Sequence, residues 1–440
     1  MYLKLALRNT KRSMLDYLLY MASMVMLTSI IFLSNCIADT GDMQAGFQTM
    51  ALPLLIVLIM AVFANYINHF VIRQRAKEFA TYMLLGMEKD KLTLVFLCEL
   101  FLTGLLCFVV GVASGTGIFS ICCHTLLLDI AGHSMSRIIL KSILQTFGYF
   151  CCVEILTTFF MKRKIYNLQI VQLMREKQHN QPLGTGRKSF WGWMLMISFF
   201  GYLALLSGIS FLSGRIMSVS ISFISLPVLM CVFSFYRWLY AFIASLRLSQ
   251  ADTLYQGNRL YQMAEMTGGS KTGANVNTIF CICFIFSAAA FVFGTLLLNP
   301  AVSIFEQKEQ QWMGFLQISI CIIFMIIYFS ILSLSQIIDL KREDRNIRLL
   351  FHMGKSCSDL KKLICMQVLL KLFMPVLMSF MMLWTAAPFV NHKLNSILPI
   401  HDHLLKAMGS FMVCFFVLYL CYFGMVYVIS TRYIKFITKQ

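Results

Sequence analysis

The stretch LTLVFLCELFLTGLLCFVVGVASGTGI, residues 92–118, contains one charged side chain, that of Glu99. A helix needs about 20 mostly apolar residues to cross the hydrocarbon core of a bilayer. This stretch is therefore long enough and apolar enough to predict a transmembrane helix.

Nine further segments show the same pattern. Of the 440 residues, 59% are hydrophobic and only 13% are charged, and the mean hydropathy is +0.75. Soluble domains carry about 25% charged residues, so this composition excludes an ordinary soluble fold. We predict an all-α polytopic membrane protein with ten transmembrane helices, at residues 17–38, 49–72, 92–118, 138–161, 190–212, 217–245, 277–299, 314–338, 363–388 and 406–430.

The distribution of Lys and Arg predicts the orientation in the membrane. The net charge is +18, and 29 of the 37 Lys and Arg residues fall in alternate segments between the predicted spans. Cations accumulate on the cytoplasmic side of membrane proteins, beside an anionic lipid surface. We therefore expect both termini to be cytoplasmic, and this clustering argues against nucleic-acid binding. The cation-rich segments are 1–16, 73–91, 162–189, 246–276, 339–362 and 431–440.

Patterns that predict catalysis or metal binding are missing from the sequence. None of the 15 cysteines has zinc-ligand spacing, and no H-E-x-x-H motif occurs among the eight histidines. The segments GTGRKS (184–189) and GGSKT (268–272) do not fit the phosphate-binding pattern G-x-x-x-x-G-K-[ST]. The sequence thus predicts no metal site, no cofactor and no ATP site in this chain, and an integral-membrane enzyme is the least favoured hypothesis.

An internal repeat follows the second and eighth predicted spans. RQRAKEFATYMLLG, residues 73–86, aligns without a gap to KREDRNIRLLFHMG, residues 341–354, at a shift of 268 residues. In both copies a charged cluster precedes an apolar stretch, a glycine, a polar turn and the next span. The pattern predicts a short amphipathic helix that a glycine terminates.

Apolar residues at spacings of three and four predict one apolar face on each of these two helices. Such a helix either lies on the bilayer surface or inserts into a groove on a partner. A solvated connector that carries topology charges is the alternative. The face comprises Phe79, Tyr82 and Met83 in the first copy and Ile347, Leu350 and Phe351 in the second.

These stretches resemble the FtsX-like permease family. The similarity is greatest in RQRAKEFATYMLLGMEKDKLTLVFLCELFLTGLL (73–106) and FMKRKIYNLQIVQLMREK (160–177), and it favours the ten-span branch of bacitracin-export permeases. That branch carries a large extracellular domain between spans seven and eight, where this chain has only residues 299–313. The resemblance implies an interfacial N-terminal helix at 1–16, a first permease repeat at 17–180, central spans and a linker at 181–276, and a second repeat at 277–440.

The resemblance also implies a function and a set of coupling residues. Members of this family are non-enzymatic membrane subunits of the bacterial cytoplasmic membrane, paired with a separate cytoplasmic ABC ATPase dimer that binds ATP and Mg²⁺. The coupling residues carried over are Arg75, Lys77, Glu78, Phe79, Tyr82, Met83, Gly86, Arg345, Ile347, Leu350, Phe351 and Gly354.

We therefore expect export or displacement of an amphipathic or peptide-like substrate, such as an antimicrobial peptide. The alternative is a subunit that passes motion or a signal to a membrane partner without transport. A second permease or a sensor kinase is a further candidate partner.

Among the charged residues inside predicted spans, four are singled out as intramembrane candidates: Glu99, Glu154, Arg237 and Lys371. A charge at the centre of a span costs about 2.5–3.5 kcal/mol on insertion scales, so each is a candidate for function. Structural pairing within the helix bundle and contact with substrate are both open. Glu154 and Arg237 are each expected toward the cytoplasmic end of a span, where they can form an ion pair.

Overall fold

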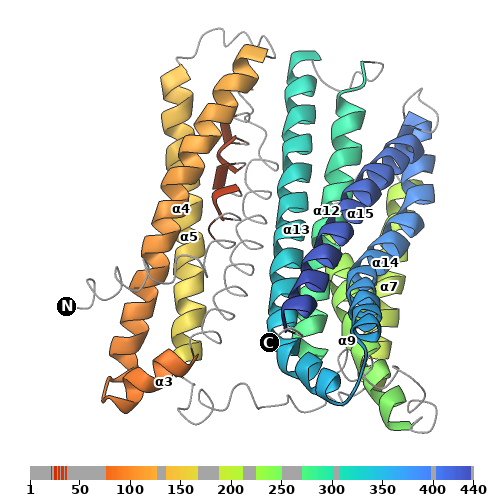
Figure 1. Cartoon of the computed structure of the whole chain (residues 1–440). Helices are drawn as coiled ribbons and strands as arrows, with labels where there is room; N and C mark the ends of the chain where they lie inside the picture. Colours follow the sequence, from red (N-terminus) through yellow and green to blue (C-terminus); the bar gives the residue numbers. More distant parts are fainter. Residues whose placement is uncertain are drawn as a thin grey trace. The chain divides into compact units, whose positions relative to one another are not determined.

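The structure is a computed structural model that describes residues 76–125, 135–166, 188–211, 224–249, 270–300, 307–397 and 403–437, together with scattered positions between 21 and 36. These residues form helices joined by turns, and none of them lies in a strand. The helices (Figure 1) are α3 (Ala76–Leu84), α4 (Lys89–Thr125), α5 (Met135–Tyr166), α7 (Lys188–Phe211), α9 (Ser225–Ser249), α12 (Ser270–Leu297), α13 (Gln307–His352), α14 (Cys357–Ile397) and α15 (His403–Ile437).

Among the described residues, eight helices are long and apolar enough to cross a membrane, which confirms an all-α polytopic membrane protein. They overlap the predicted spans three to ten. A shorter apolar helix, Met24–Leu33, falls inside the first predicted span. The second span, at 49–72, and the interfacial helix at 1–16 lie outside the described residues, so the total of ten spans stays a prediction.

The chain divides into two compact units. The first comprises Met1–His179 with Ser303–Leu334, and the second comprises Asn180–Val302 with Ser335–Gln440. The helix α13 contributes residues to both units. The division of the chain into two permease repeats around a central pair of spans stays a prediction.

In the first unit, the helix that includes Met24–Leu33 lies directly against the backbone of α4. A Cβ atom added to Gly111 would lie 2.7 Å from Cβ of Thr28, and one added to Gly115 would lie 2.8 Å from Cδ1 of Phe32. Gly111 and Gly115 thus form a G-x-x-x-G pair, which lets transmembrane helices approach closely in the absence of a hydrophobic driving force. The core beside this contact contains Phe32, Cys36, Phe119 and Ile138.

A buried polar chain joins the same first-span helix to α5. The side-chain amide of Asn35 donates to Oγ1 of Thr146 over 3.0 Å, and Thr146 in turn donates to the carbonyl oxygen of Ser142 over 2.7 Å. Hydrogen bonds of this kind link transmembrane helices where apolar contacts alone discriminate little between partners. The sequence analysis did not identify Asn35 or Thr146.

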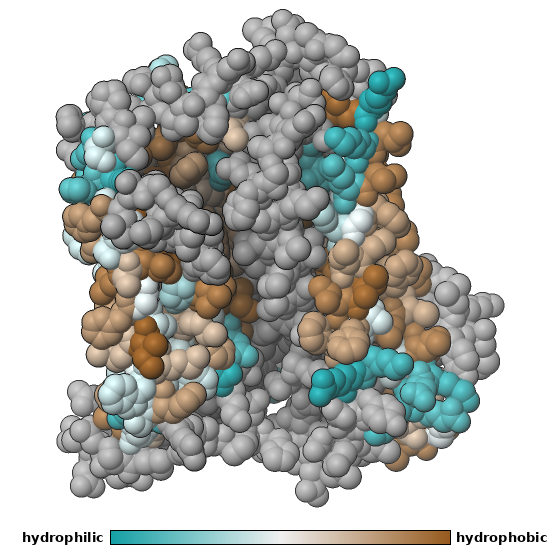
Figure 2. Space-filling view, turned by 180° about the vertical axis from the view of Figure 1, so that it is seen from behind, coloured by the Kyte–Doolittle hydropathy of each residue, from teal (hydrophilic) through white to brown (hydrophobic). Residues whose placement is uncertain are grey.

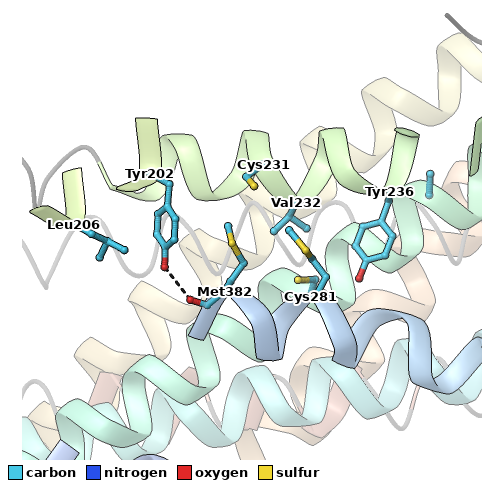
Figure 3. Close-up of a cluster of buried hydrophobic side chains, with 9 residues drawn as sticks. Tyr202, Leu206, Cys231, Val232, Tyr236, Cys281 and Met382 are labelled. Atoms are coloured by element: carbon cyan, nitrogen blue, oxygen red, sulfur yellow. Dashed lines mark hydrogen bonds between the residues drawn. The ribbon is translucent and has the colours of Figure 1, made fainter. Parts of the chain in front are cut away.

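In the second unit, the core is formed by α7, α9, α12 and α14 (Figure 3). Tyr202 of α7 donates to the carbonyl oxygen of Met382 over 3.0 Å, and Tyr236 of α9 donates to that of Met374 over 3.1 Å. Both acceptors belong to α14, which continues without a break through Pro375 and Pro388. Two tyrosines on separate helices therefore fix α14 through its main chain. The buried cluster is Tyr202, Leu206, Cys231, Val232, Tyr236, Ala274, Cys281, Met378 and Met382.

The surface of the described helices is apolar where a membrane would cover it. Figure 2 shows brown apolar side chains over much of the middle of the helices, with teal hydrophilic side chains nearer their ends. In α15 only 11% of the most apolar 18-residue window is buried within the protein. This helix therefore offers most of its length to lipid or to another membrane helix.

The close contact at Gly115 predicts a specific sensitivity to substitution. In Gly115→Ala the added methyl group meets Phe32 and, at 2.9 Å, the backbone carbonyl of Ser29. Overpacking costs about 1–3 kcal/mol, more than the gain of roughly 0.5–1 kcal/mol from replacing a helical glycine. We expect a lower midpoint of thermal unfolding for the purified chain in detergent.

Gly117 on the same helix is the matched control, because an added Cβ there meets nothing within 4 Å. Gly117→Ala should leave the midpoint unchanged or raise it slightly. Equal midpoints for the two variants would show that the first-span helix does not pack on α4 at Gly115.

Candidate functional site

The candidate site consists of two helix corners, which we define as residues 79–96 (the first corner) and 347–364 (the second corner). At the first corner α3 ends at Gly86, whose φ of 89° lies in the left-handed region that favours glycine. The amide of Gly86 donates to the carbonyl of Met83 over 3.1 Å, and that of Met87 donates to Tyr82 over 3.0 Å. This pair of bonds is a Schellman motif.

The second corner repeats this geometry at the predicted shift of 268 residues. Gly354 has a φ of 90° and donates to the carbonyl of Phe351 over 3.0 Å, while Lys355 donates to Leu350 over 3.2 Å. Each donor and acceptor is the counterpart of one in the first corner. The sequence repeat therefore corresponds to a structural repeat of the helix ends.

The helices after the two glycines also begin in register. The amide of Leu92 donates to the carbonyl of Glu88 over 3.0 Å, and that of Leu360 donates to Ser356 over 3.1 Å. Ser356 accepts a bond from the amide of Asp359 at 3.2 Å and donates to its carboxylate at 2.7 Å, so its side chain caps the first turn of α14. Both long helices, α4 and α14, therefore start at the same point, three residues after the glycine.

The inner face of each corner is buried in its own unit. Phe79 packs edge-to-face on Phe96 of α4, with ring centroids 5.4 Å apart. Its counterpart Ile347 is buried as well, and so is Ile364, the counterpart of Phe96. Phe79 and Ile347 thus position the helix ends, and neither side chain is available to a partner.

The outer face of each corner is apolar and exposed. Leu85 is 79% exposed, and its counterpart Met353 is 72% exposed. Leu84 and Leu349 are exposed beside them. These four residues were not predicted from the sequence, because the apolar face was expected at the residues spaced by three and four.

The remaining predicted coupling residues differ in how far they are exposed. Tyr82, Met83 and Leu350 are half-buried, while Glu78 and Phe351 are exposed. Arg75 lies outside the described residues, and the side chains of Lys77 and Arg345 are not described. The second copy is not a short separate helix as the sequence suggested, because α13 runs unbroken from Gln307 to His352.

Two of the four intramembrane charges lie in the helices that follow the corners. Glu99 on α4 is buried, and its counterpart at the 268-residue shift on α14 is the buried Gln367. Lys371, on α14, is half-buried, and its counterpart is the buried Thr103. At both positions, therefore, each helix carries a polar side chain, but only one helix of the two carries a charge.

Glu154 and Arg237 have neighbours that the sequence did not predict. The carboxylate of Glu154 lies beside Gly104 of α4, where an added Cβ would be 2.5 Å from its Oε1 atom. Arg237 donates to the side-chain oxygen of Asn275 over 3.1 Å. Within its own unit, Arg237 thus has a neutral amide as its hydrogen-bond partner, and a pair with Glu154 of the other unit stays a prediction.

No three His, Cys, Asp or Glu side chains gather as metal ligands within the described parts of the chain. The candidate site thus consists of apolar and backbone contacts at helix ends. This arrangement suits contact with another protein.

Residues 50–170 match a model of the family described as FtsX-like permease C-terminal. This part of the chain is similar to the FtsX-like permeases. Over 258 residues it is 23% identical to the bacitracin export permease protein BceB of Bacillus subtilis (strain 168), and the aligned region covers 55% of this chain and 40% of that relative. The chain thus spans less than half the length of the curated relative that it matches.

The FtsX-like region includes α3, α4 and α5, and so contains the first corner. The second corner lies outside the matched residues, and the geometry of its backbone is what relates it to the first. Together with the apolar helices, this similarity indicates a multi-pass bacterial membrane protein.

The left-handed glycines predict a local loss of order on substitution. An Ala at a left-handed position costs about 1–2 kcal/mol, so Gly86→Ala and Gly354→Ala should loosen the Schellman bonds. We expect hydrogen exchange at the amides of Met87 and Lys355 to accelerate by about 5–30-fold. Exchange mass spectrometry of the purified chain measures this change.

Gly409 on α15 is the control, because it lies within a helix and an added Cβ meets nothing within 4 Å. Gly409→Ala should leave exchange at both corners unchanged. If Gly86→Ala or Gly354→Ala also left it unchanged, the Schellman bonds would not hold the corners.

Proposed function

We propose that this chain is the membrane-spanning permease subunit of an ABC transporter, and that its two corners receive the motion of a separate cytoplasmic ATPase dimer. The observation that carries the proposal is the matching geometry of the corners at residues 79–96 and 347–364. An ATPase made of two equivalent subunits requires two equivalent contact points, and the duplicated corners supply them.

The chemistry of the corners supports this role. Each presents an exposed apolar tip, at Leu85 and at Met353, beside exposed lysines such as Lys89 and Lys362. Apolar anchors within a polar rim are typical of protein interfaces. The Lys and Arg distribution predicts that both corners face the cytoplasm, where an ATPase with ATP and Mg²⁺ would be.

The inner contacts provide a path from the corner to the membrane. Because Phe79 packs on Phe96, a displacement of α3 acts on α4 through a rigid aromatic contact. At the second corner, α13 is continuous from its membrane span to His352, so a displacement there acts along one helix. Motion applied at the tips is thereby carried into the spans.

The proposed substrate is an amphipathic or peptide-like molecule that the machine exports or displaces. The relative in Bacillus subtilis is named a bacitracin export permease, which supports a substrate of this class and a role in antimicrobial peptide resistance. A second permease or a sensor kinase remains a candidate partner. Recovery of ATPase activity without any movement of such substrates would favour the alternative of a subunit that only transmits motion or a signal.

Detergent co-purification of the tagged full chain, with mass spectrometry and an ATPase assay, tests the proposal. The wild-type chain should recover a nucleotide-binding subunit and its ATPase activity. Leu85→Asp and Met353→Asp each place a charge on an exposed tip, and loss of an apolar anchor should lower the recovered activity by about tenfold or more. These positions are better probes than Phe79 or Ile347, whose burial means that Asp would disrupt the corner itself.

Leu405→Asp is the matched control, because Leu405 is 48% exposed at the start of α15, on the predicted outer side. It should recover the same activity as the wild type. Failure to recover any nucleotide-binding subunit would overturn the permease assignment. Unchanged recovery with both Asp variants would exclude the tips as the docking points.

A further inference from the structure

A cluster of cations and aromatic rings lies at one end of α7 and α9 in the second unit. The guanidinium of Arg237 is 5.2 Å from the ring centroid of Phe233 and 5.9 Å from that of Trp191. The ammonium of Lys188 is 4.5 Å from the ring centroid of Phe242. We call these five residues the aromatic–cation cluster.

The charges of this cluster have no acidic partner on the helices that form it. Arg237 donates from Nη2 to Asn275, and Lys188 lies 3.5 Å from Oγ of Ser245, both neutral groups. The helices α7, α9 and α12 contain no Asp or Glu. On the packed helix α14 the acidic residue is Asp359, whose carboxylate already binds Ser356.

A guanidinium has five N–H donors in a planar fork, and the structure leaves part of this capacity unused. The Nε atom of Arg237 is buried and has no hydrogen-bond partner among the described residues. Burial without a partner is unfavourable for a charged donor, so an external acceptor is expected. Phosphate oxygens match this fork well, and a nearby ammonium adds to their binding.

The position of the cluster identifies the source of that phosphate. Lys188 begins one membrane span, and Asn275, the hydrogen-bond partner of Arg237, lies two residues into another that starts at Gly273, so both cations are near the boundary of the hydrocarbon region. Beside them on α7, Phe190, Trp193 and Ile197 are exposed apolar side chains that suit contact with acyl chains. Tryptophan at such a boundary is typical of the membrane interface. The Lys and Arg distribution predicts the cytoplasmic leaflet, which is rich in anionic lipids.

We propose that Lys188 and Arg237, framed by Trp191, Phe233 and Phe242, bind the phosphate of an anionic phospholipid headgroup. The lipid supplies the counter-charge that these helices lack. It would hold the ends of α7, α9 and α12 together, since Asn275 of α12 positions the same guanidinium. In a membrane of zwitterionic lipid alone, the described helices α7, α9 and α12 would supply no acidic counter-charge to these cations.

The test uses the full chain in detergent, titrated with dioleoylphosphatidylglycerol or with dioleoylphosphatidylcholine, and native mass spectrometry counts the bound lipid. The wild type should bind the glycerol lipid more tightly. Lys188→Gln and Arg237→Gln should each weaken that binding by about fivefold, the factor for one cation beside an anionic surface, and leave the choline lipid unaffected. Arg237→Lys keeps the charge and should retain more binding than Arg237→Gln.

Lys406→Gln on α15 is the matched control, an exposed lysine at the predicted outer end of the same unit. It should leave the lipid preference intact. An unchanged preference in both Gln variants, or an equal loss in Lys406→Gln, would overturn the site. Displacement of the bound glycerol lipid by millimolar inorganic phosphate would instead indicate a site for free phosphate and overturn the lipid proposal. The thermal midpoint of the exposed Lys188→Gln variant should match the wild type, which separates binding from folding.

Discussion

The hydrocarbon interior of a bilayer offers no hydrogen-bond partners, so the backbone of each span must satisfy its own polar groups within a helix. Polar side chains in these spans follow the same constraint. Thr146 donates to the carbonyl of Ser142, and Thr278 donates to that of Ala274, each four residues earlier on its own helix. Two features can still vary among such helices: how closely they approach one another and where they end. Gly111 and Gly115 allow a close approach between helices, and Gly86 and Gly354 determine where two helices end.

Helix ends are therefore where this chain can interact with water-soluble partners. At each corner the Schellman bonds satisfy the last carbonyls of one helix, and the next helix begins three residues after the glycine. So short and fully bonded a turn cannot bend far without breaking hydrogen bonds. Under the proposed function, a force on Leu85 or Met353 would therefore be transferred to α4 or α14 and would not be absorbed by a loop.

The sequence predicted the features that depend on composition and on backbone geometry. Spans three to ten were found because a run of about 20 apolar residues has few structural alternatives. The pairing of Gly86 with Gly354 was found because a left-handed helix end strongly favours glycine. The inward direction of Phe79 was not predicted, since an amphipathic pattern defines an apolar face but not what covers it. The hydrogen bond between Arg237 and Asn275 was not predicted either. Asn275 is uncharged and lies on another helix, so no pattern in the sequence connects it to Arg237.

The two corners have the same backbone geometry, whereas the helices that follow them differ in their polar side chains. This difference fits the proposed roles of the corners and the spans. The hydrogen bonds of the two corners match donor for donor, although only the first corner falls in the region that matches the FtsX-like family. Two turns into the following helices, Glu99 is matched by Gln367, and one turn further Thr103 is matched by Lys371. A contact with two equivalent ATPase subunits would constrain the corners to stay equal. The spans have no such constraint, because each must fit the helices around it in its own unit. The two corners would then keep the same backbone geometry because they contact equivalent ATPase subunits. The side chains of the following spans would differ because the two spans pack against different helices.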